Sequence, residues 1–226
     1  DGPNAPIPHW REYNTTSRRT SLVVDPLDGR LPARVPGARP FPVPERCGSL
    51  QRGEPCDTYT DYGFGVRCTV HGGGLPDAMI PAVYNANMRI VQTPGYVAIT
   101  YELIHDTRVF TVGTAPHVSK KIALFHGDSR ARWDGDTFVV DTTNLAPGTF
   151  RPTSTAQLHL TEKFRRTAQD TIEYTVTIDD PGTWTRPWTF ALPLTTDSTP
   201  LPAYDCHEGN YAMHNILSAA RAEERE

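Results

Sequence analysis

Apolar and polar residues alternate along most of the chain after residue 84, and this period of two is typical of β-strands with one buried face. Short turns rich in Gly, Asp and Pro separate the alternating runs. The hairpin signals are strongest at residues 134–136 and 167–170, where a few polar residues join two runs. The pattern predicts antiparallel strands rather than βαβ units, at residues 88–93, 96–112, 137–143, 157–166, 171–179 and 184–192.

Only the C-terminal stretch has the period of a helix. Met213, Ile216, Leu217 and Ala220 form one apolar stripe, which predicts a helix over residues 212–224. We therefore expect a mainly β fold with one short C-terminal helix. Sequential up-and-down strands of this length favour an antiparallel β-barrel of the calycin or lipocalin type, and a two-sheet sandwich is the second possibility.

The N-terminal part differs in composition. Residues 1–46 hold 9 of the 21 prolines, and proline lacks a backbone donor and favours extended geometry. One strand-like piece, residues 21–25, is followed by the turn-forming residues 26–29. Apolar side chains such as Trp10 and Phe41 predict an extended arm packed on a single barrel domain at residues 47–226, with a flexible linker as the alternative.

Length and charge exclude several classes of protein. A chain of 226 residues with 38% hydrophobic residues can bury a core without a metal or a disulfide, so it is neither a stapled mini-protein nor a disordered chain. The net charge of −4 and the lack of a long Lys/Arg run predict no nucleic-acid partner. No stretch approaches the roughly 20 apolar residues that span a bilayer, so no membrane partner is expected either.

Cys47, Cys56, Cys68 and Cys206 lack the paired spacing of a zinc site or a redox motif. One or two disulfides are favoured over free thiols. The chain begins at Asp1, as a mature protein does after removal of a signal peptide, although a chain trimmed for expression would begin in the same way. The expectation is a secreted or periplasmic protein, with the oligomeric state left open.

A carboxylate stands on the apolar face of the strand predicted at residues 157–166. Glu162 shares that face with Leu158, Leu160 and Phe164, and burying a charge is costly unless it is paired, hydrogen-bonded or protonated. Either Glu162 has a structural partner, Arg166 or another arginine, or it lines a polar cavity and takes part in acid/base chemistry. The alternation alone leaves both possibilities open.

The strand predicted at residues 184–192 carries aromatic residues and a cation. Its even positions place Arg186 between Trp184 and Trp188. Such a face can stack on a flat aromatic or sugar ring and bind an anionic group. In the alternative, the face belongs to the core of a barrel and Arg186 is the partner of Glu162.

The run 96–112 carries candidates on both faces. Tyr101 and His105 belong to one face, and Asp106 and Arg108 to the other. His105 is either a hydrogen-bonded core residue or a group that transfers protons. Which face is interior is not settled by the pattern.

A polar loop, residues 206–211, precedes the predicted helix. Histidine titrates near neutral pH, so His207 is suited to proton transfer, and Glu208 stands beside it to orient it or to act as the second acid/base group. In the alternative, the polar groups of this loop cap the helix, with Asn210 as the N-cap.

Metal ligands are present but not in a recognised spacing. A site assembled across strands could use several residues, but no pair has the local spacing of a zinc motif, so we expect neither a metal nor an organic cofactor. The sequence has no G-x-S-x-G, G-x-G-x-x-G or Walker motif, which argues against nucleophile-elbow hydrolases and nucleotide enzymes. The residues that could contribute to a metal site are His105, His117, His126, His159, His207 and Glu208.

Seven stretches of the chain form a recognisable set: SLVVDP (21–26), YN (84–85), IVQTPGY (90–96), IHDTR (104–108), GDSRARWDGDT (127–137), DPGTWTRPW (180–188) and CHEGNY (206–211). As a set they resemble a family of uncharacterised exported bacterial β-rich proteins. The resemblance covers most of the chain after residue 20 and implies export and a common scaffold, but it brings no activity. Residues 47–66 look like an insertion relative to that family, which implies a local Cys47–Cys56 bridge and leaves Cys68 and Cys206 as a long-range pair.

These features favour an enzyme: a cofactor-independent lyase, isomerase or hydrolase that acts on a small aromatic or carbohydrate-like molecule in the barrel cavity. The alternative is a lipocalin-like protein that binds a small molecule without catalysis. Because a carrier of apolar ligands should have a mostly aliphatic interior, the charged residues on apolar faces favour the enzyme. The expected catalytic residues are His105, His207, Glu162, Glu208 and Arg186, and the expected substrate-binding residues are Arg108, Asp106, Trp184, Trp188, Tyr211 and Tyr101.

Overall fold

The structure is a computed structural model. It describes residues 21–38, 58–59, 67–68, 87–148, 150, 153–196 and 203–225. Cys47, Cys56 and most of the proline-rich residues of the predicted arm lie outside the described residues, and so does the local disulfide expected there.

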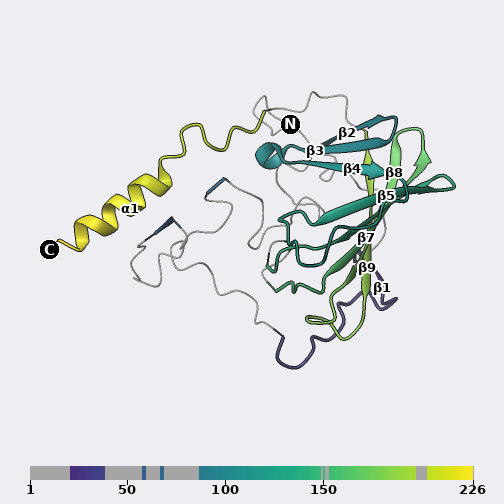
Figure 1. Ribbon diagram of the computed structural model, residues 1–226, viewed down its shortest axis with the longest axis horizontal. Coiled ribbons are helices and arrows are strands. Elements are labelled where there is room, and N and C mark those ends of the chain that lie inside the picture. Colours follow the sequence, from purple (N-terminus) through teal and green to yellow (C-terminus); the bar gives the residue numbers. More distant parts are fainter. Residues whose placement is uncertain are drawn as a thin grey trace, which may run out of the picture.

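One mixed sheet forms the body of the protein, with the strand order β1-β9-β8-β7-β6-β5-β4-β3-β2 (Figure 1). The expectation of a mainly β fold with one short C-terminal helix is confirmed. That helix, α1, extends away from the sheet in Figure 1. The elements are β1 (Val23–Asp25), β2 (Met88–Thr93), β3 (Tyr96–Tyr101), a short 3₁₀ helix (Leu103–His105), β4 (Thr107–Val112), β5 (Asp128–Asp134), β6 (Thr137–Thr143), β7 (His159–Ala168), β8 (Thr171–Asp179), β9 (Trp188–Thr195) and α1 (Ala212–Glu223).

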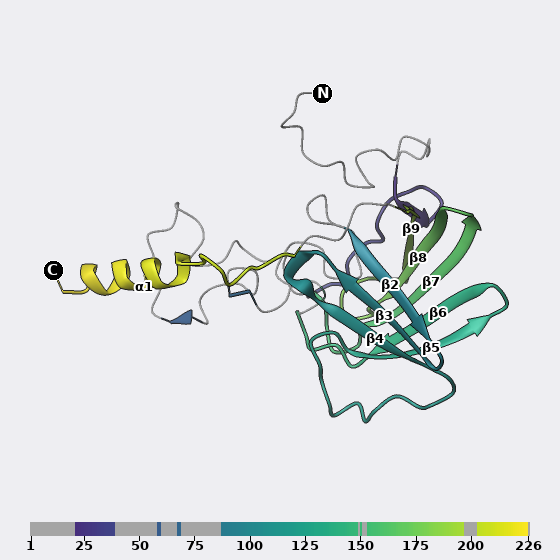
Figure 2. The same cartoon turned by 90° about the horizontal axis from the view of Figure 1, so that it is seen from above.

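The sheet does not show the closure that the barrel prediction requires. Its order ends at β1 and β2, and no ladder joins these two strands within the described part of the chain. An up-and-down barrel also needs antiparallel neighbours throughout, whereas β4 and β5 pair in parallel. Residues 113–127, which we call the crossover loop, run along one side of the sheet to connect β4 with β5 (Figure 2).

Two details of the strand pattern differ from the prediction. The run 96–112 is broken at residues 102–106, where Glu102 has helical dihedrals and His105 has a φ of +56°. The alternation continues through this turn, so the pattern alone did not reveal it. The strand β5 was not predicted because its sequence, DSRARWD, is mostly polar; it is a strand because it pairs with β6 along its length.

The core lies on one face of the sheet, which we call the inner face. In β6, β7, β8 and β9 the even-numbered side chains point to this face, as a period of two requires. The opposite, outer face carries mainly Thr and charged residues. A chain of ring contacts runs across the inner face through Phe110, Phe138, Phe164, Tyr174, Phe190, Trp188 and Trp184.

The described part of the N-terminal segment packs on the edge formed by β9. The Ala191 amide donates to the Leu22 carbonyl (2.9 Å), and the Thr185 amide donates to the Ala33 carbonyl (2.9 Å). At the other end of the chain, Cys68 and Cys206 form a disulfide with a Cα–Cα distance of 5.7 Å, which confirms the long-range pair. Among the described residues, no helix has the length and hydropathy needed to cross a bilayer.

Candidate functional site

Glu162 is fully buried on the inner face, and its partner is Arg108. Arg108 Nη1 donates to Oε1 (3.0 Å) and Nη2 to Oε2 (2.6 Å), so the guanidinium holds both carboxylate oxygens. The Tyr174 hydroxyl also donates to Oε1 (2.6 Å). The alternative of a buried ion pair with an arginine is therefore confirmed, but the partner is Arg108 and neither Arg166 nor Arg186.

The turn at residues 102–106 explains why this partner was not foreseen. Because the chain reverses there, β3 and β4 pair antiparallel, with Ile99 opposite Arg108 and Val97 opposite Phe110. Odd positions of β3 thus share a face with even positions of β4. The prediction assigned odd residues to one face and even residues to the other over the whole run 96–112, and so placed Arg108 on the face opposite Tyr101.

The surroundings of Arg108 fix its charge state. Burial alone would lower the pKa of Arg108, but the charge of Glu162 raises it above its usual range. Burial and the same carboxylate raise the pKa of the Tyr174 hydroxyl well above its usual value, so this phenol remains a donor. Arg108 also donates weakly to Tyr101 Oη (3.5 Å) and Thr142 Oγ1 (3.4 Å). The structure thus brings together the predicted residues Glu162, Arg108 and Tyr101, in a buried and tightly paired network.

The predicted aromatic platform does not form. Trp184 and Trp188 are buried in the core with their rings edge to face at 5.9 Å. Arg186 lies outside this pair, and its Nη2 donates to Asp25 Oδ1 (2.6 Å) at the surface. The reason is local: β9 begins at Trp188, and the amide of Trp184 closes a turn on the Asp180 carbonyl, so the alternation does not extend across Pro187.

Replacing Arg186 with alanine should change the free energy of unfolding by no more than about 1 kcal/mol, because exposed ion pairs are screened by solvent. Both partners are about half exposed or more, at 51% for Arg186 and 63% for Asp25. Urea unfolding of Arg186→Ala and of the native chain measures the difference. A loss of several kcal/mol would mean that Arg186 has a buried role.

Of the remaining predicted residues, His105 and Asp106 lie in the turn that follows β3. His105 Nδ1 lies 3.3 Å from the Tyr204 carbonyl and 3.2 Å from the Tyr204 amide, which places the loop before α1 against this turn. Asp106 forms an ion pair with His126 (3.0 Å). His207, Glu208 and Tyr211 are exposed on that loop, and none has a described contact with the network of Glu162.

Asn210 does not cap the helix as the alternative interpretation of this loop proposed. The N-cap of α1 is Tyr211, without a side-chain capping bond. The side-chain amide nitrogen of Asn210, Nδ2, instead lies 3.2 Å from Cys68 Sγ. The loop is therefore positioned by the disulfide and its neighbours.

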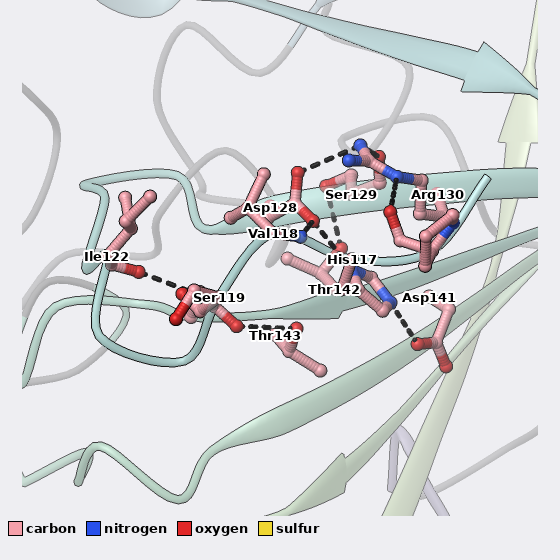
Figure 3. Close-up of polar contacts among 12 residues, drawn as sticks. His117, Val118, Ser119, Ile122, Asp128, Ser129, Arg130, Asp141, Thr142 and Thr143 are labelled. Carbon is pink, nitrogen blue, oxygen red and sulfur yellow. Dashed lines mark hydrogen bonds and ion pairs between the residues drawn. The ribbon is translucent and has the colours of Figure 1, made fainter.

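A second polar cluster, on the outer face, was not predicted as a site. It is a chain of alternating carboxylates and imidazoles: Asp128 Oδ2 to His117 Nδ1 (2.8 Å), His117 Nε2 to Asp141 Oδ1 (2.8 Å), and Asp141 Oδ2 to His159 Nε2 (2.6 Å). We call these residues the imidazole–carboxylate chain. Figure 3 shows its first three members, with His117 reaching from the crossover loop to strands β5 and β6.

His117 lies between two carboxylates of the outer face. Its Nδ1 is 2.8 Å from Asp128 Oδ2 and its Nε2 is 2.8 Å from Asp141 Oδ1, so each ring nitrogen has a carboxylate oxygen as its hydrogen-bond partner. Asp128 also accepts from the Val118 amide (3.0 Å) and pairs with Arg130 (2.8 Å). The crossover loop is therefore held to β5 and β6 through the carboxylates of Asp128 and Asp141.

His159 forms the open end of the chain. It stands on the outer face of β7 with 40% of its side chain exposed, compared with 29% for Asp141 and 27% for His117. Among the described residues, none hydrogen-bonds its Nδ1. This imidazole is therefore the member of the chain that is most open to another molecule.

The sequence contained a partial signal for this cluster. Asp141 and His159 stand at polar positions of the two predicted strands 137–143 and 157–166, and adjacent strands bring such positions together. Asp128 lies in the unpredicted strand β5, and His117 lies in a loop whose path depends on the parallel pair. Of the imidazole–carboxylate chain, only Asp141 and His159 could therefore have been inferred from the sequence.

The stability of the protein should depend on Asp141 in acid. Burial raises the pKa of Asp141, but the hydrogen bonds and charges of His159 and His117 lower it. The net effect places the pKa of Asp141 below its ordinary value of 3.8. A lowered folded-state pKa contributes stability above the unfolded-state pKa and loses it as the pH falls, so the advantage of the native chain over Asp141→Asn should shrink below about pH 4. Urea unfolding between neutral and acid pH measures it; a constant difference would contradict the assignment.

Within the described residues, no group of three or more His, Cys, Asp and Glu side chains is arranged to hold a metal ion. Comparison of the chain with protein-family models, with curated proteins and with solved structures found no match.

Proposed function

We propose that this protein is a cofactor-independent acid/base enzyme, a lyase, isomerase or hydrolase, and that His159 with Asp141 is its proton-transfer pair. The observation that carries the proposal is the 2.6 Å contact between Asp141 Oδ2 and His159 Nε2, at an imidazole that is 40% exposed. Histidine titrates near neutral pH, and a carboxylate on one ring nitrogen fixes the tautomer and leaves the other nitrogen to react.

The proton path follows from this geometry. In the neutral ring, Nε2–H donates to Asp141 and Nδ1 carries the lone pair. Nδ1 takes a proton from the substrate, and the resulting imidazolium is stabilised by the ionised Asp141. After exchange with solvent at this exposed nitrogen, the ring gives a proton to another atom of the substrate or to the leaving group, which restores the neutral ring. His117 is a positioning residue: it contacts Asp141 and keeps that carboxylate oriented and charged.

The surroundings of His159 support a hydroxylated, carbohydrate-like substrate. Asp179 lies directly opposite His159 on β8, and Thr161 and Thr177 are paired neighbours on the same outer face. Hydroxyl and carboxylate groups are partners for sugar hydroxyls. The proposal thus places the reaction on the outer face rather than in a barrel cavity, and it assigns Glu162 and Arg108 to the support of the fold.

The disulfide Cys68–Cys206 supports the further proposal that the protein is exported, because disulfides persist in oxidising compartments.

The enzymatic proposal is tested with a panel of monosaccharides and small glycosides incubated in D₂O, with turnover and deuterium incorporation followed by NMR and mass spectrometry. For any compound that is turned over, His159→Gln should lower kcat by about 100-fold or more, with little change in thermal stability. The matched control is His207→Gln, another exposed histidine, which should leave turnover unchanged. Loss of activity in His207→Gln but not in His159→Gln would return the site to the loop before α1.

A specific observation favours binding as a second candidate function. Arg108 Nε and Trp188 Nε1 are buried donors that have no hydrogen-bond partner in the described part of the chain. Both belong to the aromatic inner face, so a small aromatic molecule with an acceptor group would satisfy one of them. A thermal-shift screen of aromatic acids tests this; a stabilising compound that is recovered unaltered would support a binding protein.

A further inference from the structure

The crossover loop exposes several apolar side chains within a few residues of one another. Ile122 is 47% exposed, Leu124 43% and Phe125 51%, and Val118 is 36% exposed. Side chains of this kind scattered singly over a surface need no explanation, but a cluster in one loop indicates a contact surface.

The same loop has a local charge opposite to that of the whole protein. Residues 113–127 contain no Asp or Glu and include the exposed pair Lys120 and Lys121, whereas the full chain has a net charge of −4. Asp128, the carboxylate that directly follows the loop in sequence, is already paired with His117 and Arg130. The lysines are therefore not neutralised by acidic residues of their own segment.

The loop holds its apolar side chains outward because its backbone is anchored to the sheet. Asn144 Nδ2 donates to the carbonyls of Ser119 (2.8 Å) and Ile122 (2.9 Å). The Leu124 amide donates to the Asn144 carbonyl (2.9 Å), and Leu124 in turn accepts from the Ala146 amide (2.8 Å). The exposure of Ile122 and Leu124 is thus a feature of a fixed conformation. Figure 3 shows Ser119 and Ile122 on the loop beside the strands.

Further apolar residues lie on the same side of the sheet. Val91, Ala98 and Val109 are directly opposite one another across β2, β3 and β4. They point to the outer face, and Val91 (46%) and Val109 (60%) are exposed. His117 ties the crossover loop to outer-face carboxylates, so the loop and this row belong to one side of the protein.

We propose that the crossover loop docks this side of the protein on the surface of an anionic lipid bilayer. Lys120 and Lys121 would contact the phosphate headgroups, and Ile122, Leu124 and Phe125 would enter the boundary between headgroups and acyl chains. Surface binding combines buried apolar area with attraction between basic residues and anionic lipids, and both elements are present here. The sequence predicted no membrane partner because it has no apolar span of about 20 residues, and that argument does not apply to binding at the bilayer surface.

Flotation of the full chain with vesicles tests the proposal. We expect binding to vesicles of phosphatidylcholine with phosphatidylglycerol, weak binding to phosphatidylcholine alone, and release at high salt. The pair Lys120→Glu and Lys121→Glu should weaken binding to the anionic vesicles by about tenfold or more. The pair Ile122→Ser and Phe125→Ser should weaken it by a similar factor through lost apolar burial.

Leu27→Ser is the matched control, because Leu27 is 97% exposed and lies in the turn after β1, far from the loop in sequence. This variant should leave vesicle binding unchanged. Circular dichroism of each variant reports whether it is folded. His159→Gln should bind vesicles like the native chain, so a failure of the enzymatic proposal and a failure of the membrane proposal can be distinguished. Absence of binding to the anionic vesicles, or binding that the loop variants leave intact, would overturn the proposal. Self-association of the native chain that the apolar pair abolishes, without vesicle binding, would assign the loop to a contact between copies instead.

Discussion

Replacing Arg108 with methionine should lower the free energy of unfolding by about 3–5 kcal/mol, because the variant leaves a buried carboxylate without its cation. Glu162 is 0% exposed, and both of its oxygens are held by Arg108, with one also held by Tyr174. Methionine fills a similar volume, so the loss reports the charge rather than a cavity. Urea unfolding at neutral pH, with the slope checked for two-state behaviour, measures it.

Two further variants separate the charge from the packing. The double variant Arg108→Met with Glu162→Met should recover most of the stability, since replacing both partners of a buried ion pair by apolar residues is often neutral. Tyr174→Phe should cost about 1–2 kcal/mol, because it removes one hydrogen bond and leaves the ion pair in place. An Arg108→Met variant as stable as the native chain would contradict this account.

Glu162 shows which part of the buried network could be predicted from the sequence. The alternation placed Glu162 correctly on a buried face with Leu160 and Phe164. The cost of burying a charge then required that this carboxylate have a partner. The partner was out of reach because Arg108 lies on a strand that is not adjacent to β7 and whose parity is reversed by the turn at residues 102–106. Periodicity describes one strand at a time, and pairing between strands depends on where the chain turns.

The polar cluster on the outer face was harder to predict from the sequence than the burial of Glu162. Polar residues on an exposed face carry no periodic signal that distinguishes a solvated surface from an assembled cluster. Asp141 and His159 meet because β6 and β7 are neighbours, which the order of the strands suggested. His117 joins them because the crossover loop has to pass along this face between two parallel strands. That connection follows from a topology that up-and-down alternation did not predict.

Gly127→Ala should be nearly as damaging as the loss of Arg108, with an expected cost of about 2–5 kcal/mol. Gly127 has a φ of +68°, a conformation that favours glycine. A Cβ there would lie 2.5 Å from the Thr143 carbonyl oxygen and 2.9 Å from Leu145 Cγ, so backbone of the sheet would have to move. Because Gly127 directly precedes Asp128, the shift should also disturb the His117 contacts, which changes in the NMR signals of the imidazole would report.

Gly135→Ala is the matched control for this variant. Gly135 has a similar φ of +60° in the turn between β5 and β6, but a Cβ there would meet no atom within 4 Å. It should cost only about 1–2 kcal/mol, the penalty of the left-handed conformation. The difference between the two variants in urea unfolding isolates the close approach of the crossover loop to β6. Equal losses in both would mean that the loop can move away from the sheet, and they would weaken the argument that the loop holds a fixed conformation.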